Sequence, residues 1–396
     1  MKKITLTITL LIFQFIANAQ GWVQKSNATS SIRMGAFGFS IGTKSYIGGG
    51  DNNTNFLNDF WEYNPTTDVW TQKANYCTTP NARRFGVGFS IGTKGYTGLG
   101  EASATLGYCF SDFYEYNPTT NVWTQKASFP DAGRSRPVGV GTTTKGYVGT
   151  GYDYNLNKKN DIWEYNPINN TWTAKASLTN GNRHSATGFS INDKVYIGTG
   201  IDVNNIRLFD LWEFDPVTNL WTQKTNMPGL GRTNAASFAS SSNGYVIGGT
   251  NVSTLLSDAY SYTPQTDSWV QLPNVPITIS SSVGFWSGTN GYIGTGQTNG
   301  GRINNLYQFN PTLLSTEENQ FNEILTIYPN PTTGKVFLKF SDLILSDITI
   351  FNSIGQEIFK SKNSLTEIDF TEKPNGIYFI RFNFGTKSFT KKIVKN

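Results

Sequence analysis

The sequence predicts an all-β protein in which a six-bladed β-propeller precedes a small antiparallel β-sandwich. Three observations support this fold class. A block of about fifty residues recurs along the chain, the 396 residues include 40 glycines, and the repeat gives way near residue 317 to a different alternating pattern. The chain is 14% aromatic and 15% charged, which excludes a disordered chain, and its glycine content argues against a helical one.

The first nineteen residues are typical of an export signal. Lys2 and Lys3 give a positive start, residues 4–16 are almost wholly apolar, and Ala17-Asn18-Ala19 supplies the small residues that a signal peptidase accepts. The alternative is a membrane anchor, but the apolar run is shorter than the roughly 20 residues of a membrane-spanning helix. We therefore predict cleavage between Ala19 and Gln20, followed by export of the remaining chain.

Charge and composition exclude several classes of function. The formal net charge is +5, and it falls to +3 and is spread along the chain once Lys2 and Lys3 are removed. This is not the charge pattern of a nucleic-acid-binding protein or of a membrane-surface protein. One histidine and two cysteines leave no multi-histidine metal centre and no cysteine-rich zinc site. We therefore expect no nucleic-acid partner, no metal and no other cofactor.

Three sequence markers recur in each repeat unit. The first is a tryptophan at a spacing of 48 to 53 residues, usually in a context such as Trp70-Thr71-Gln72-Lys73. The second is a tyrosine shortly before a glycine pair, and the third is an acidic or amide residue that opens an aromatic stretch ending in proline. The tryptophans are Trp22, Trp70, Trp123, Trp172, Trp221 and Trp269. The residues that open the aromatic stretches are Asp59, Asp112, Asp161, Asp210, Asp258 and Asn305.

Each unit has the alternation of four short strands separated by turn residues. In the first unit we expect strands at residues 37–41, 46–49, 59–63 and 69–72, with turns at residues 42–44 and 64–67. Four antiparallel strands per repeat predict one propeller blade. A β-solenoid is less favoured, because it would need parallel rungs of shorter period.

Over residues 20–314 these markers resemble the kelch repeat, which has paired glycines after the second strand, an aromatic residue on the third and tryptophan on the fourth. The resemblance implies a six-bladed kelch propeller. The sixth unit lacks a tryptophan after Pro311, whereas residues 22–25 have the sequence of a fourth strand. We predict that residues 22–25 form the outer strand of the sixth blade and close the ring.

Residues 324–396 follow a linker at residues 315–323 and predict a small, Ig-like antiparallel β-sandwich. Tyr328-Pro329-Asn330-Pro331, Pro374-Asn375-Gly376-Ile377-Tyr378 and the closing residues 391–395 resemble the type A C-terminal sorting domain of the type IX secretion system. The resemblance implies engagement with that machinery, transport across the outer membrane, and a secreted or cell-surface location. Removal of the domain at the surface is also implied. The alternative is a sandwich with a purely structural role.

The candidate binding residues belong to loops that a four-stranded blade brings to one face. Arginines stand just before the innermost strands of units one to five, and carboxylates follow the glycine pairs of units one to four. The arginines are Arg33, Arg84, Arg136, Arg183 and Arg232. The carboxylates are Asp51, Glu101, Asp153 and Asp202. Such groups around a channel could bind a sugar or an anion. The alternative is that each arginine pairs with a carboxylate of its own or a neighbouring blade.

We expect a monomeric, secreted or surface-displayed module that binds a glycan or a protein, and we assign no catalytic residue. His184 is the one imidazole, at a position where kelch repeats commonly carry histidine for structural reasons. The alternative is a carbohydrate-active enzyme similar to the kelch sialic acid epimerase, with arginine and carboxylate groups at the channel mouth. For Cys77 and Cys109, both on one face of the second blade, an exported location predicts a disulfide. Two separate thiols are the alternative.

Overall fold

The computed structural model describes residues 21–77, 81–102, 108–311, 325–340, 347–353, 355–362, 365–384 and 387–396. The predicted signal segment, its cleavage site between Ala19 and Gln20, and the predicted linker lie outside these residues. The chain divides into two compact units, residues 1–311 and 312–396. Every regular element of the described residues is a β-strand, which confirms the predicted all-β class.

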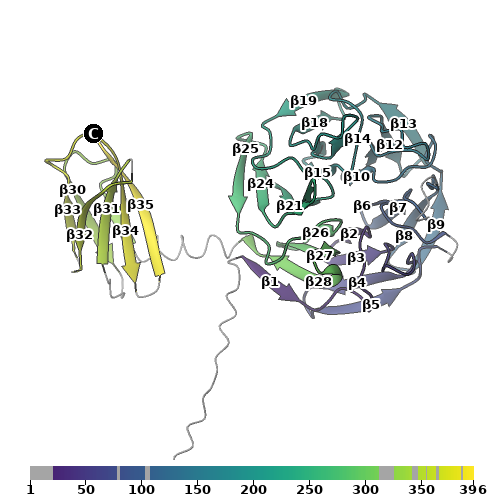
Figure 1. Ribbon diagram of the computed structural model, residues 1–396, viewed down its shortest axis with the longest axis horizontal. Helices are drawn as coiled ribbons and strands as arrows, with labels where there is room; N and C mark the ends of the chain where they lie inside the picture. Colours follow the sequence, from purple (N-terminus) through teal and green to yellow (C-terminus); the bar gives the residue numbers. More distant parts are fainter. Residues whose placement is uncertain are drawn as a thin grey trace, which may run out of the picture. The chain divides into compact units, whose positions relative to one another are not determined.

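The first unit contains six four-stranded antiparallel sheets arranged radially (Figure 1). Blade 1 consists of β2 (Phe37–Ile41), β3 (Lys44–Gly48), β4 (Phe60–Asn64) and β5 (Val69–Lys73). Blade 2 consists of β6 (Val87–Ile91), β7 (Lys94–Gly98), β8 (Phe113–Asn117) and β9 (Val122–Lys126). Blade 3 consists of β10 (Val138–Gly141), β11 (Gly146–Gly149), β12 (Ile162–Asn166) and β13 (Thr171–Lys175). The innermost strands of neighbouring blades contact one another in a closed circle, so the sheets surround a central channel.

Blades 4 to 6 repeat the same order, except that the last blade takes its outer strand from the beginning of the chain. Blade 4 consists of β15 (Thr187–Ile191), β16 (Lys194–Gly198), β18 (Leu211–Asp215) and β19 (Leu220–Lys224). Blade 5 consists of β20 (Ala236–Ala239), β21 (Gly244–Ile247), β24 (Ala259–Thr263) and β25 (Ser268–Leu272). Blade 6 consists of β26 (Val283–Ser287), β27 (Asn290–Thr298), β28 (Gly301–Phe309) and β1 (Trp22–Lys25).

Strand β1 joins the two ends of the propeller. It pairs antiparallel with β28, so that Trp22 lies opposite Phe309 and Lys25 opposite Leu306. The Trp22 side chain is 2% exposed, its ring centroid lies 5.1 Å from that of Phe309, and its Nε1 donates a hydrogen bond of 2.8 Å to the carbonyl of Pro273. This pairing leaves neither chain end as an open sheet edge inside the ring.

The second glycine of each pair connects its blade to the next one. Its φ lies between 86° and 108°, a backbone conformation that favours glycine, and its N–H donates to a carbonyl of the neighbouring blade at 2.7–2.8 Å. The donors Gly50, Gly100, Gly151, Gly200, Gly249 and Gly296 bind the carbonyls of Arg83, Arg134, Arg183, Arg232, Ile279 and Arg33, respectively. The recurrence of the glycine marker therefore has a structural cause.

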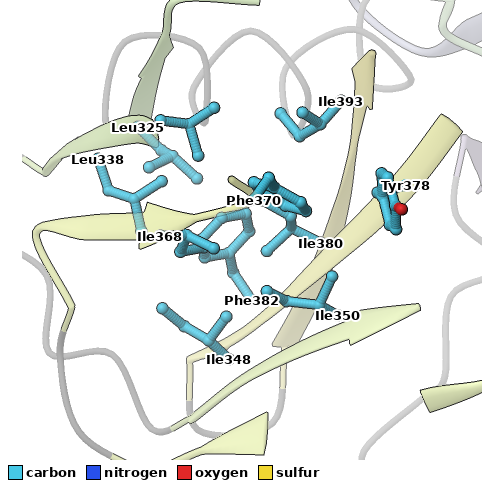
Figure 2. Packing of buried hydrophobic residues seen from close by; sticks show 11 residues of the cluster. Leu325, Leu338, Ile348, Ile350, Ile368, Phe370, Tyr378, Ile380, Phe382 and Ile393 are labelled. Atoms are coloured by element: carbon cyan, nitrogen blue, oxygen red, sulfur yellow. The ribbon is translucent and has the colours of Figure 1, made fainter. Parts of the chain in front are cut away.

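The second unit is a sandwich of two antiparallel sheets. One contains β29 (Leu325–Tyr328), β30 (Lys335–Phe340) and β33 (Glu367–Asp369), and the other contains β32 (Glu357–Ser361), β31 (Asp347–Asn352), β34 (Gly376–Phe384) and β35 (Lys387–Lys395). Buried side chains from both sheets form one core, with Phe370, Ile380 and Phe382 at its centre (Figure 2). The alternation of apolar residues in this part of the sequence thus corresponds to strands with one buried face.

Candidate functional site

Six residues, one from each blade, close a ring of backbone hydrogen bonds at one end of the channel. The N–H of each residue donates to the carbonyl of the equivalent residue in the neighbouring blade at 2.7–3.1 Å. These mouth-ring residues are Gly35, Phe85, Arg136, Ser185, Asn234 and Ser281. The five that are not glycine have φ values of 51° to 56°, a region that side chains disfavour and that clusters at functional sites. The ring therefore fixes five side chains around the channel mouth.

The mouth ring lines a cavity of about 150 Å³. Residues that follow the ring positions, such as Gly86, Ala186 and Ser282, are small and also line this cavity. Among the described residues that line this cavity, Arg136 alone is charged. The electrostatic character of the cavity therefore depends on how the Arg136 guanidinium is paired.

The Arg136 guanidinium has neutral partners. Its Cζ lies 3.7 Å from the centroid of the Phe85 ring, its Nη1 donates to Asn234 Oδ1 at 3.3 Å, and its Nε donates to the Tyr152 hydroxyl at 3.4 Å. Within the described ranges, no carboxylate oxygen lies within 4.0 Å of it. A half-buried cation thus borders the cavity with long hydrogen bonds and no direct counter-ion.

The arginines predicted from the sequence fall into two groups. Arg33, Arg183 and Arg232 are fully buried, and each forms a two-pronged ion pair with the aspartate that opens the third strand of its own blade. These aspartates are Asp59, Asp210 and Asp258. The three arginines therefore hold blades together and do not line the mouth cavity, in agreement with the alternative left open by the sequence.

In blades 2 and 3 the equivalent buried arginines are Arg83 and Arg134, which pair with Asp112 and Asp161. Arg84 and Arg136, which the sequence grouped with Arg33, Arg183 and Arg232, are therefore not equivalent to those three arginines, and Arg136 lines the mouth cavity instead. Both blades carry two arginines at nearly the same place in the repeat, so proximity to the inner strand does not distinguish the buried residue from the one at the channel mouth.

Asp51 and Glu101 lie on the channel-mouth side of the blades and are paired with arginines. Arg84 donates from Nε to Glu101 Oε1 at 2.9 Å and from Nη1 to Asp51 Oδ2 at 2.8 Å, and Arg302 pairs with Asp51 as well. Burial opposes ionisation of Glu101, but Arg136 and hydrogen bonds from Tyr152 and other donors outweigh it and lower the pKa of this carboxyl. These groups neutralise one another.

The other two predicted carboxylates shape their own loops. Asp153 Oδ1 accepts the backbone N–H groups of Asn155 and Asn157 at 2.9 and 3.0 Å. Asp202 Oδ1 accepts those of Asn204 and Ile206 at 2.9 and 2.8 Å. The geometry therefore assigns Asp153 and Asp202 a local structural role.

His184 belongs to β14 (Arg183–His184), which pairs with β17 (Ile201–Asp202) beside the mouth. Its ring packs edge-on against Tyr152, with centroids 5.1 Å apart. Burial, together with the nearby charges of Arg136 and Lys158, lowers the pKa of His184 to about 3. We expect its ring, followed by NMR as the single histidine signal, to remain neutral from about pH 8 to pH 5. A titration midpoint near the ordinary value of about 6.5 would contradict this prediction.

The disulfide predicted between Cys77 and Cys109 is not formed, and both residues are free thiols. Cys77 packs against the aromatic core that contains Phe37 and Tyr76, whereas Cys109 forms a backbone bridge with Glu101. Each cysteine is thus held by different neighbours. Burial raises the pKa of both thiols to about 11.

The described part of the chain lacks two further kinds of feature. These residues contain no group of three or more histidine, cysteine, aspartate or glutamate side chains placed to hold a metal ion. They also contain no helix with the length and apolar character needed to cross a membrane.

Comparison with known proteins identifies both parts of the chain. The kelch motif model matches residues 40–75, 182–228 and 245–276, so the first unit is a kelch-type propeller. The model of the secretion system C-terminal sorting domain matches residues 326–396. The chain therefore combines a propeller that carries kelch motifs with a C-terminal sorting domain, which indicates export by the type IX secretion system to the cell surface or the extracellular space. Both resemblances predicted from the sequence are confirmed.

One similar solved structure is described as "Structure of YjhT". It aligns with 72% of this chain and 96% of its own length, with a TM-score of 0.59 and 17% sequence identity. This likeness shows a shared fold, which confirms the predicted propeller architecture. No curated protein matches the chain.

Phe85, Ser185 and Asn234 of the mouth ring were not predicted from the sequence. Each ring residue stands two positions before its inner strand and is followed by a small residue or proline. Alignment of the six copies at the inner strand would have matched Arg136 with Phe85 instead of Arg84. The signal that would have found the mouth ring is thus a position that is equivalent in all six repeats but carries different residues, whereas the markers carry the same kind of residue in each repeat.

Proposed function

We propose that this exported propeller is a binding module whose channel mouth holds an anionic group of a glycan or protein ligand on Arg136. The observation that carries this proposal is the contrast between neighbouring arginines. Arg84 and Arg302 are paired with carboxylates, whereas Arg136 borders the cavity without one. A guanidinium that has no carboxylate partner of its own can bind a carboxylate, sulfate or phosphate of a ligand through two parallel hydrogen bonds.

The other mouth-ring side chains suit recognition of a polar ligand. Ser185, Asn234 and Ser281 bring hydroxyl and amide groups to the same cavity as Arg136. A few polar groups fixed at a concave site give orientation and specificity to a bound ligand. Because the mouth ring fixes the backbone of these residues, little ordering entropy is lost on binding.

The titratable groups of the mouth favour binding over proton-transfer chemistry. A general acid or base works best when its pKa lies near the working pH. Here the pKa of Glu101 is lowered by Arg136 and its hydrogen-bond donors against the effect of burial, and the pKa of His184 falls to about 3 through burial. Burial also raises the pKa of Tyr152. The pKa values of these three groups therefore give no specific support to the alternative function, that of a carbohydrate-active enzyme.

Arg136→Ala is expected to abolish most of the binding while leaving the fold intact. The test compares the mature chain with this variant on arrays of acidic glycans and acidic peptides at low salt, where charge pairing is least screened. Loss of a charged hydrogen bond should weaken binding by about ten- to a hundredfold. Arg302→Ala is the matched control, because Arg302 is already paired with Asp51. Unchanged binding by Arg136→Ala would contradict the proposal.

A further inference from the structure

Two neighbouring loops on the mouth side of blades 3 and 4 hold apolar side chains out in solvent. The loop after Asp153 carries Tyr154 and Leu156, which are 55% and 46% exposed, and the loop after Asp202 carries Val203 and Ile206, which are 60% and 57% exposed. These four residues are named the apolar rim. An exposed group of apolar residues of this kind often marks an interaction site.

The apolar rim is held in place by hydrogen bonds. Asp153 and Asp202 fix the backbone of their loops, as described above. Lys158 connects the two loops, because its Nζ donates to the backbone carbonyl of Asp202 and to Asn205 Oδ1. The apolar side chains are therefore presented by ordered loops, which lowers the entropic cost of a contact with a partner.

Three cations without a direct carboxylate partner belong to the channel mouth or to the same two loops. Arg136, Lys158 and Arg207 have no carboxylate oxygen within 4.0 Å in the described part of the chain. Arg207 donates from Nη1 to the carbonyl of Asn205 at 3.0 Å, and its buried Nε has no hydrogen-bond partner. After burial, which is the largest cause, all three charges lower the pKa of His184, whereas Glu101 acts in the opposite direction. The surface therefore combines three cations that form no direct ion pair with apolar contact area.

We propose that blades 3 and 4 form a docking surface for an acidic protein segment that also carries aliphatic or aromatic side chains. Its carboxylates would pair with Arg136, Lys158 and Arg207, and its apolar side chains would rest on the apolar rim. Charge complementarity argues for an acidic partner. The apolar rim argues for a protein over a glycan, because burial against apolar groups stabilises a contact, whereas desolvating sugar hydroxyls without hydrogen bonds costs free energy.

This inference rests on the proposed function, since Arg136 is shared, and the test separates the two. The probes are labelled peptides of glutamate and leucine, matched peptides of glutamate and serine, and oligogalacturonate as an acidic glycan, each titrated against the full mature chain. We expect the glutamate–leucine peptides to bind at least about tenfold more tightly than the other two probes, since one buried aliphatic side chain contributes that much.

Two variants distinguish the contributions of apolar and charged groups. Val203→Ser with Ile206→Ser should weaken binding of glutamate–leucine peptides at least about tenfold and leave glutamate–serine peptides unaffected. Lys158→Ala with Arg207→Ala should weaken binding of both peptides. Val217→Ser is the matched control, because Val217 is 93% exposed in the turn between β18 and β19 of the same blade and should change nothing.

The outcomes are separable. Binding of oligogalacturonate that depends on Arg136, combined with unchanged peptide binding by the Val203→Ser, Ile206→Ser variant, would overturn the protein-docking inference and leave the proposed function standing. Failure of every acidic probe to bind the mature chain, with melting behaviour intact, would overturn both. Because Val203 and Ile206 are exposed, the double variant is expected to melt like the parent protein.

Discussion

Arg183→Ala is expected to lower the free energy of unfolding by about 3–5 kcal/mol, because it leaves a buried carboxylate without its partner. Arg183 is fully buried and Asp210 is 7% exposed. The guanidinium donates to both carboxylate oxygens, at 2.7 and 2.8 Å, and to the carbonyl of Thr199 at 3.0 Å. Thermal and urea unfolding of the full chain, followed by tryptophan fluorescence, would measure the loss.

The loss should depend on pH. Burial alone would raise the pKa of Asp210, but hydrogen bonds and charge from Arg183, with Trp212 and Asn180, lower it below its ordinary value. In the parent protein this pair therefore stabilises the fold above the unfolded pKa of about 4 and loses its effect as pH falls through the lower folded pKa. In the variant burial dominates, so protonation relieves the isolated carboxylate. The difference in stability should be largest at neutral pH and shrink towards pH 4.

A double variant separates the unpaired charge from the loss of packing. Arg183→Met combined with Asp210→Leu removes both charges and keeps apolar volume, and it should be markedly more stable than Arg183→Ala alone. Arg136→Ala is the matched control, because that guanidinium is half-buried and has no direct counter-ion. If Arg183→Ala melts like Arg136→Ala, the buried ion pair does not stabilise the blade.

The fold could be predicted because its markers recur for structural reasons. The second glycine of each pair adopts a positive φ and bonds to the next blade. The aspartate before the third strand receives the buried arginine in five blades, and the tryptophan Nε1 of each outer strand donates to the chain of the neighbouring blade. Six copies of one geometric requirement produce a periodic sequence.

The candidate site could be predicted only in part, because its residues do not recur. Glu101, Asp51 and Arg84 do come together near the channel mouth. The mouth ring, however, carries a different side chain in almost every blade, so only its backbone geometry identifies it. Arg136 was predicted as a mouth residue from its position just before an inner strand, a position that did not separate it from Arg33, Arg183 and Arg232, which are buried in ion pairs. The cysteines were paired on a shared face, and a shared face does not determine which neighbours each thiol contacts.

Trp22→Ala is expected to lower the melting temperature at least as much as Trp172→Ala. Truncation of a buried tryptophan costs about 3–5 kcal/mol, and Trp22 is 2% exposed whereas Trp172 is half-buried. Both indoles donate hydrogen bonds of 2.8 Å to a neighbouring blade, Trp22 to Pro273 and Trp172 to Ala127. Trp22 has an added role, because β1 is the strand that joins the first and last parts of the propeller chain.

Loss of β1 pairing would expose the edge of β28 and release the contact with blade 5, so its effect should extend beyond one side chain. Val23→Ser is the matched control, because Val23 lies on the same strand and is 39% exposed. A surface substitution of this kind normally changes stability by less than about 0.5 kcal/mol. Differential scanning calorimetry of the three variants decides the matter. If Trp22→Ala behaves like Val23→Ser while Trp172→Ala is destabilised, β1 does not hold the ring shut, and closure would depend on the contacts between the inner strands β2 and β26.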